Sequence, residues 1–167
     1  MIEITKVYKQ SIPATRFIGK KYGDEDRVDG GFGVKWGEWF ENDWFDVIKK
    51  QVDGNLADWF EDGEATIGLM TAVDGKFQYW IGYFTPVGTP VPEGFQSVDF
   101  PKANLGVCWI YGKEHELFMH EEASMKKLQE EGFNPLDTWC FERYVCPRFT
   151  TPDEKGNVTL DICFFVE

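Results

Sequence analysis

Long apolar runs, clustered basic residues and paired cysteines are all missing from this chain of 167 residues. No apolar run approaches the ~18 residues that a membrane-spanning helix needs, so we expect no membrane segment. The N-terminal residues lack the basic-then-apolar order of a signal peptide, which favours a cytoplasmic protein. The 17 Lys and Arg residues, against 29 Asp and Glu, form no basic stripe that could follow a phosphate backbone. We therefore expect no direct binding of nucleic acid.

Metal-binding and phosphate-binding motifs are missing as well. The four cysteines form no CxxC pair, and Cys140 and Cys146 fall roughly 20 Å apart on one expected strand, too far to share a metal ion or a disulfide. His115 and His120 are five residues apart, whereas the two zinc-binding histidines of HExxH are four apart. The glycine-rich segment 30–33 lacks the Lys-Ser/Thr of a phosphate loop. The sequence thus predicts reduced, structural thiols, no metal ion and no cofactor.

Aromatic residues, by contrast, are abundant: 7 Trp, 6 Tyr and 15 Phe in a chain whose net charge is -12. Many stand beside carboxylates, as in segments 36–41, 58–61 and 141–144. An aromatic-walled cavity with one buried carboxylate holds large, flat cations through ring-face attraction and ion pairing. An aromatic-rich core under an acidic surface produces the same composition. Composition alone leaves both interpretations open.

Hydrophobic periodicity predicts two helices among eight extended segments. The helices are expected at 34–50 and 114–131, and the extended segments at 4–10, 16–23, 65–73, 76–84, 95–100, 104–111, 138–146 and 158–166. Asp74-Gly75 is the strongest signal for a hairpin turn. Gly132 and Pro135 end the second helix in the usual order.

This order suggests a duplicated βαββ unit and an α+β fold. The pseudo-repeats span about 1–84 and 95–167, and both begin alike, with Arg16–Lys20 matching Cys108–Lys113. We expect a single domain, 1–167, in which the units form a curved antiparallel sheet with two long helices on one face. A cleft between the halves is then the natural ligand site.

Glu142 is the most informative polar residue. Strand alternation places it on one face with Cys140 and Tyr144, and Arg143 on the other. A carboxylate among aromatic residues needs a partner to stay charged. The alternative to a buried carboxylate in a ligand pocket is that Glu142 is exposed, or is paired with Lys or Arg across the sheet. Glu121 falls within the apolar stripe of the second helix, which suggests a second buried carboxylate.

Over its whole length the chain resembles the GyrI-like small-molecule-binding domain, which is also the effector-binding half of BmrR-type and Rob-type (AraC-related) transcription regulators. The resemblance rests on the duplicated βαββ order, the tryptophan-bearing first helix and several short segments. These segments are Ile12-Pro13-Ala14, Tyr79-Trp80-Ile81-Gly82, Val91-Pro92-Glu93-Gly94, Leu128–Phe133 and Phe141-Glu142-Arg143-Tyr144. It implies a cytoplasmic fold that holds hydrophobic, often cationic, compounds in an aromatic pocket with the Glu of a Glu-x-Tyr motif at its base.

That glutamate falls on Glu142. Aromatic and apolar residues that share strand or helix faces complete the candidate ligand-binding set, although any one of them alone could be plain core. The set is Glu142, Tyr144, Trp109, Tyr111, Trp36, Trp39, Phe40, Tyr79, Ile81 and Tyr83.

The favoured function is therefore a stand-alone small-molecule-binding protein, monomeric or weakly dimeric, for hydrophobic, flat or cationic compounds. One alternative is a hydrolase of strained cyclopropane-bearing toxins, as in some relatives, with Glu142 as the catalytic carboxylate. The other is an acidic interaction protein that acts on gyrase or on a transcription regulator. The length leaves no room for a DNA-binding domain, so a regulatory role would need a protein partner.

Overall fold

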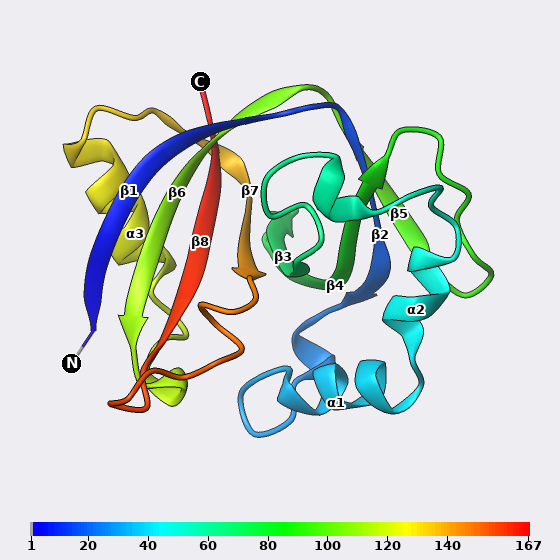
Figure 1. The fold of residues 1–167 in the computed structure, drawn as a ribbon, viewed down its shortest axis with the longest axis horizontal. Helices are drawn as coiled ribbons and strands as arrows, with labels where there is room; N and C mark the ends of the chain where they lie inside the picture. The colour runs from blue at the N-terminus through cyan, green and yellow to red at the C-terminus, as the bar shows by residue number, and fades with distance from the viewer. Residues whose placement is uncertain (1) are drawn as a thin grey trace. The chain divides into compact units, whose positions relative to one another are not determined.

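A computed structural model describes residues 2–167 of the chain (Figure 1). The chain forms two compact units. Unit 1 consists of Met1–Pro13 and Lys102–Glu167, and unit 2 of Ala14–Pro101. Each unit combines helices with antiparallel strands, which confirms the predicted α+β class.

Unit 1 contains four strands in the order β1-β6-β8-β7. Its elements are β1 (Glu3–Ile12), β6 (Ala103–Gly112), the short 3-10 helix η3 (Glu114–Glu116), α3 (Glu121–Glu130), β7 (Pro135–Tyr144) and β8 (Val158–Val166).

Unit 2 also contains four strands, in the order β3-β4-β2-β5. Its elements are β2 (Thr15–Tyr22), η1 (Asp24–Asp26), α1 (Gly33–Glu41), α2 (Trp44–Lys49), η2 (Leu56–Asp58), β3 (Thr66–Val73), β4 (Lys76–Pro86) and β5 (Gln96–Phe100). The predicted hairpin turn joins β3 to β4: Asp74 and Gly75 have φ of 52° and 76°, the positive values that a tight turn of this kind requires.

The two units repeat one topology. In unit 2 the chain runs β2, α1 and α2, β3, β4, and in unit 1 it runs β6, α3, β7, β8. Each βαββ repeat receives its fourth strand from outside the repeat: β1 pairs with β6 and β5 pairs with β2 (Figure 1). The first strand of the chain therefore packs with the second repeat.

Both predicted long helices are interrupted. The helix expected at 34–50 divides into α1 and α2 because Asp43 adopts a left-handed conformation, with φ of 53°, and Asn42 donates its side-chain amide to the Glu38 carbonyl at 2.8 Å. The helix expected at 114–131 divides into η3 and α3 at Met119, whose φ is 70°. Asp tolerates the left-handed conformation better than most residues do. The apolar periodicity gave no sign of either break.

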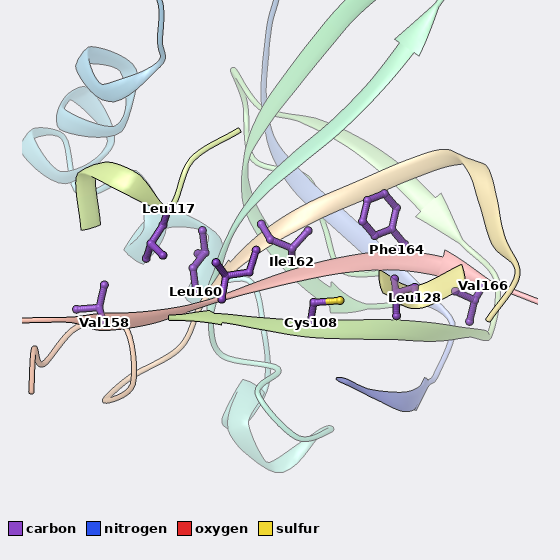
Figure 2. Packing of buried hydrophobic residues seen from close by; sticks show 9 residues of the cluster. Cys108, Leu117, Leu128, Val158, Leu160, Ile162, Phe164 and Val166 are labelled. Carbon is purple, nitrogen blue, oxygen red and sulfur yellow. The ribbon is translucent and has the colours of Figure 1, made fainter. Parts of the chain in front are cut away.

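Helix α3 covers one face of the unit 1 sheet. Leu128 of α3 is completely buried against apolar side chains that alternate along β6 and β8 (Figure 2). These side chains are Cys108, Ile110, Val158, Leu160, Ile162, Phe164 and Val166. A Cβ on Gly106 would lie 2.8 Å from Leu128 Cδ2, so the helix packs directly on the strand at that glycine. We refer to this side as the helix-covered face of unit 1.

A pair of glycines allows close approach of two strands in unit 2. Gly19 of β2 and Gly82 of β4 are cross-strand partners. A Cβ on Gly82 would lie 2.0 Å from the Ile18 carbonyl oxygen, far inside van der Waals contact. Because the obstruction is backbone, no side-chain rotation could relieve it.

Gly82→Ala should therefore lower the free energy of unfolding by at least about 2 kcal/mol, as overpacking of a well-packed site does. Gly37→Ala is the matched control, since Gly37 lies in α1 and a methyl group there would have no atom within 4 Å. Alanine should stabilise that helix by about 0.5–1 kcal/mol. Urea denaturation of both variants measures the difference, and equal midpoints would contradict the close approach.

Candidate functional site

Glu142 is buried on the helix-covered face of unit 1. It lies in β7 opposite Ile162 of β8, which belongs to the apolar cluster beneath α3. Its exposed fraction is 5%. Tyr144, two residues along the same strand, donates its hydroxyl to Glu142 Oε1 at 3.0 Å. The Glu-x-Tyr motif is thus one hydrogen-bonded unit at the edge of the apolar cluster.

The side chains next to Glu142 on this face, those of Cys140 and Tyr144, pack against the apolar cluster. The Tyr144 ring packs edge-on against Phe149, with centroids 4.8 Å apart. The pKa of the Cys140 thiol is raised to about 12, first because burial disfavours the thiolate and then because of the charges of Glu121 and Glu142. Glu121 is half-buried at the start of α3. Two carboxylates, Glu142 from the strand and Glu121 from the helix, therefore act on the same half-buried Cys140 thiol.

Trp109 and Tyr111 lie on the opposite face of the same sheet. Trp109 is the cross-strand partner of Asp161, which in turn is the partner of Arg143. Residues directly opposite on paired strands share a face, so Trp109 accompanies Arg143 and not Glu142. Within unit 1 the structure thus brings Tyr144 to Glu142 but separates both from Trp109 and Tyr111.

Both of these aromatic side chains have partners on their own face. Trp109 donates its indole N–H to the Tyr8 hydroxyl at 3.3 Å. Lys6 Nζ and the Arg148 guanidinium carbon each lie 4.5 Å from the Trp109 ring centroid. The Tyr111 hydroxyl bonds the Asp153 carboxylate. These contacts give both residues a clear structural role.

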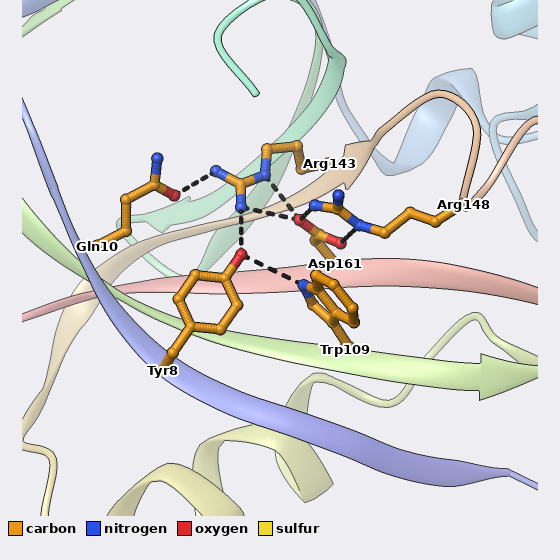
Figure 3. Close-up of polar contacts among 6 residues, drawn as sticks. All are labelled: Tyr8, Gln10, Trp109, Arg143, Arg148 and Asp161. Atoms are coloured by element: carbon orange, nitrogen blue, oxygen red, sulfur yellow. Dashed lines mark hydrogen bonds and ion pairs between the residues drawn. The ribbon is translucent and has the colours of Figure 1, made fainter. Parts of the chain in front are cut away.

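A buried ionic network occupies the centre of that face (Figure 3). Asp161 has no exposed surface, and its Oδ2 accepts from Arg143 Nε at 2.8 Å. Arg148, which follows β7, donates Nε to Asp161 Oδ1 at 2.9 Å and Nη2 to Oδ2 at 2.6 Å. Arg143 also donates Nη1 to Gln10 at 2.8 Å and Nη2 to the Tyr8 hydroxyl at 3.2 Å. The single carboxylate of Asp161 thus accepts from two guanidinium groups.

This network was not predicted, although the sequence contains a signal for it. Asp161 interrupts the otherwise apolar end of the chain, Leu160 to Val166, and a buried carboxylate requires a cationic partner. Arg143 lies in the other strand expected to be buried. The pairing of the two strands, which periodicity does not give, was the missing information.

In unit 2 the predicted aromatic residues gather on one face of the sheet, under α1 and α2. Trp36 donates its indole N–H to the Tyr79 hydroxyl at 3.0 Å, and Trp39 donates to Tyr22 at 3.0 Å. Tyr79 and Tyr22 are cross-strand partners. Tyr83, two residues from Ile81 on the same side of β4, packs against Phe45 of α2, with ring centroids 5.2 Å apart.

Burial separates these residues into core and surface. Trp39, Ile81, Tyr79 and Tyr83 are buried and form part of the core of unit 2. Phe40 is 62% exposed. Its ring centroid lies 6.4 Å from that of Trp36 and 5.4 Å from that of Phe45. The structure therefore brings the six unit 2 residues to one side of the sheet, with Phe40 at the surface and Trp36 half-buried.

Ring faces of unit 2 already hold cations of the protein itself. Lys20 Nζ lies 4.3 Å from the Trp44 ring centroid and 4.5 Å from that of Phe95, and it donates to the Gly94 carbonyl at 2.9 Å. Lys49 Nζ lies 5.4 Å from the Tyr83 ring. Burial lowers the pKa of Lys20, so this ammonium gives up hydration for ring contact. The aromatic side chains of this unit can therefore accommodate a positive charge.

Two other features are absent from residues 2–167. Across that range, no group of three or more His, Cys, Asp or Glu side chains is placed to hold a metal ion. Nor is any of its helices long and apolar enough to cross a membrane.

The four cysteines are free thiols, of which Cys146 alone is exposed.

Comparison with known proteins gives matches among solved structures. No family model and no curated protein sequence matches this chain. SAV2435 bound to tetraphenylphosphonium matches with a TM-score of 0.68 and 14% identity over 98% of this chain and 94% of its own. The C-terminal domain of EcmrR matches with a TM-score of 0.55 and 13% identity over 97% of both chains. A hydrolase encoded by lin2189 from Listeria innocua matches with a TM-score of 0.53 and 10% identity over 97% of this chain and 92% of its own.

These matches span nearly the whole chain in every case. They bear out the resemblance to the GyrI-like fold that the sequence motifs indicated. At identities of 10–14% they establish the shared fold alone.

The position of Glu142 beside Cys140 leads to a prediction about thiol reactivity. The thiolate is the reactive form, and the negative charge of Glu142 helps to raise the pKa of Cys140. Glu142→Gln should therefore speed labelling of Cys140 by iodoacetamide in mildly alkaline buffer by about threefold, since Glu142 is the smallest of the three causes that raise the pKa of this thiol. Mass spectrometry of the Cys140 peptide measures the rate. As a control, Glu122→Gln, at an exposed position in the first turn of α3, should leave the labelling rate of Cys140 unchanged. If Glu142→Gln also leaves this rate unchanged, Glu142 does not lie near the thiol.

Proposed function

We propose that this protein binds hydrophobic, flat or cationic small molecules, with Glu142 as the anionic group and aromatic side chains as the apolar contact surface. The observation that carries the proposal is the Glu142–Tyr144 pair, a carboxylate 5% exposed at the edge of an apolar cluster. A buried carboxylate favours a ligand that brings a positive charge, because the pair loses less by leaving water than either ion alone.

Three further observations support this function. SAV2435, which has the same fold, is a protein whose structure contains tetraphenylphosphonium, a flat-ringed lipophilic cation. The net charge of -12 attracts cations over a distance. Unit 2 adds ring surface on the side of its sheet under α1 and α2, where Phe40 is exposed and Trp36 is half-buried.

The proposal predicts selectivity for charge. Tetraphenylphosphonium should bind better than neutral triphenylphosphine oxide, and Glu142→Gln should weaken cation binding by roughly 30-fold or more, since loss of a desolvated ion pair costs about 2 kcal/mol or more. Isothermal titration with both probes measures the two affinities. Glu122→Gln, which removes the same charge from an exposed position, should change cation affinity less than about twofold. Equal affinities of wild type and Glu142→Gln for the cation would take Glu142 out of the binding site.

Hydrolysis is the second candidate function, favoured by the structural match to the Listeria innocua hydrolase. In that case Glu142 would act as general base toward a water molecule. The Tyr144 hydroxyl, 3.0 Å from Glu142 Oε1, would orient the Glu142 carboxylate.

Turnover separates the two candidates. We expect that a cyclopropane-bearing alkylator incubated with the wild-type protein is bound without conversion, so that chromatography shows no ring-opened product above the buffer rate. Ring-opened product in excess of the protein, formed by wild type and not by Glu142→Gln, would establish the hydrolase instead.

A further inference from the structure

The strand that carries Glu142 is regularly paired with β8 over a short stretch. The pairing runs from Cys140 opposite Phe164 to Arg143 opposite Asp161, and the register shifts between Pro135 and Cys140. A slip of one residue along a paired strand moves each side chain to the other face of the sheet. Whatever fixes the register of this stretch therefore decides whether Glu142 lies on the helix-covered face.

The ionic network is located where it can fix that register. Arg143 and Asp161 are direct cross-strand partners at the end of the stretch, and they are 2% and 0% exposed. Arg148 lies beyond the end of β7 and binds the same carboxylate, with its Nη2 2.6 Å from Asp161 Oδ2. Arg143 also reaches Tyr8 and Gln10 in β1, at the far edge of the four-stranded order β1-β6-β8-β7. One guanidinium thus ties β7 to both β8 and β1.

Neither neighbouring register satisfies these charges. A slip in one direction would place Glu142 opposite Asp161 and Arg143 opposite Leu160, within the apolar cluster beneath α3. A slip in the other direction would place Arg143 opposite Ile162 of the same cluster. Both leave a buried guanidinium without a carboxylate, and the first also brings two carboxylates together. The observed register is the one of the three that pairs Arg143 with Asp161.

We propose that the Arg143–Asp161–Arg148 triad is a register lock, which keeps Glu142 on the helix-covered face and makes Arg143 and Asp161 positioning residues of the candidate site. The consequence for ligand binding rests on the proposed function, whereas the register does not. The lock acts on the face opposite to Glu142, so it touches neither Glu142 nor a ligand bound there.

The chain contains its own reporter of a slipped register. In the observed pairing Cys140 is opposite Phe164 and Cys163 is opposite Phe141, so the two thiols lie on opposite faces. A slip in the first direction makes them direct partners, about 4.5–5.5 Å apart at Cα and within reach of a disulfide. Diamide oxidises two such thiols to a disulfide and is itself reduced to the hydrazine. In a folded protein with β7 paired to β8, a Cys140–Cys163 cross-link therefore reports a slipped register.

The experiment compares variants in a Cys146→Ser background, which removes the exposed thiol. In the test variant Arg143→Met, Asp161→Leu and Arg148→Met replace the whole triad, so no charge is left unpaired. We expect at least about tenfold more Cys140–Cys163 cross-link than in wild type after brief diamide treatment, measured by mass spectrometry of the linked peptides. Circular dichroism verifies that each variant is folded.

Two more variants keep the test decisive. Asp161→Asn removes the shared acceptor charge alone and should also increase the cross-link, which covers the case in which the triple variant does not fold. Leu128→Ala loosens the core beneath α3 with the triad intact and should give no more cross-link than wild type. Wild-type levels in both triad variants, or equal cross-linking in Leu128→Ala, would overturn the register lock.

The same proteins separate this inference from the proposed function. If both hold, the triad variants bind tetraphenylphosphonium about tenfold more weakly than wild type, while Glu122→Gln, at an exposed position, binds it within about twofold of wild type. If wild type does not bind the cation, the proposed function fails, and the cross-link still decides on the register lock.

Discussion

The pairing of β7 with β8 determines the chemistry of unit 1. Glu142 and Arg143 are consecutive, so alternation sends one side chain beneath α3 and the other toward Asp161. Each face then has its own character. The apolar side chains of the helix-covered face (Figure 2) are accompanied by the carboxylates of Glu142 and Glu121. The opposite face contains the ionic network (Figure 3). Glu142, the carboxylate of the proposed binding site, and Asp161, the carboxylate of the ionic network, therefore lie on opposite faces of one sheet.

The aromatic residues of unit 2 show how one composition serves two purposes. The indole N–H groups of Trp36 and Trp39 donate to tyrosine hydroxyls on the sheet, so these large side chains are buried without an unsatisfied donor. Elsewhere in the unit, rings of Trp44 and Phe95 hold the ammonium of Lys20. Unit 2 therefore supports the interpretation of the aromatic content as a bulky core, and some of its rings also contact an ammonium group of the protein itself. The aromatic-walled cavity for a ligand stays a prediction.

Local sequence signals predicted the helices, strands and turns better than they predicted which strands pair and in what register. Asp74-Gly75 identified its hairpin because a turn depends on two residues, and alternation identified Glu142 and Tyr144 as sharing a face. The breaks at Asp43 and Met119 escaped because apolar periodicity continues across them. Trp109 was grouped with Glu142 because alternation relates residues along one strand but gives no register between strands. The Arg143–Asp161 pair, 18 residues apart in sequence, was missed for the same reason.

The central claim, that the Glu142 carboxylate receives the charge of a bound cation, is tested most directly by carbon NMR of the side-chain carboxyl groups. The protein is labelled with glutamate enriched at the carboxyl carbon, and the Glu142 resonance is assigned by its loss in Glu142→Gln. On titration with tetraphenylphosphonium, the account predicts that this resonance shifts and saturates with the binding curve, while those of exposed glutamates such as Glu122 stay in place. Saturable binding with an unmoved Glu142 resonance would contradict it.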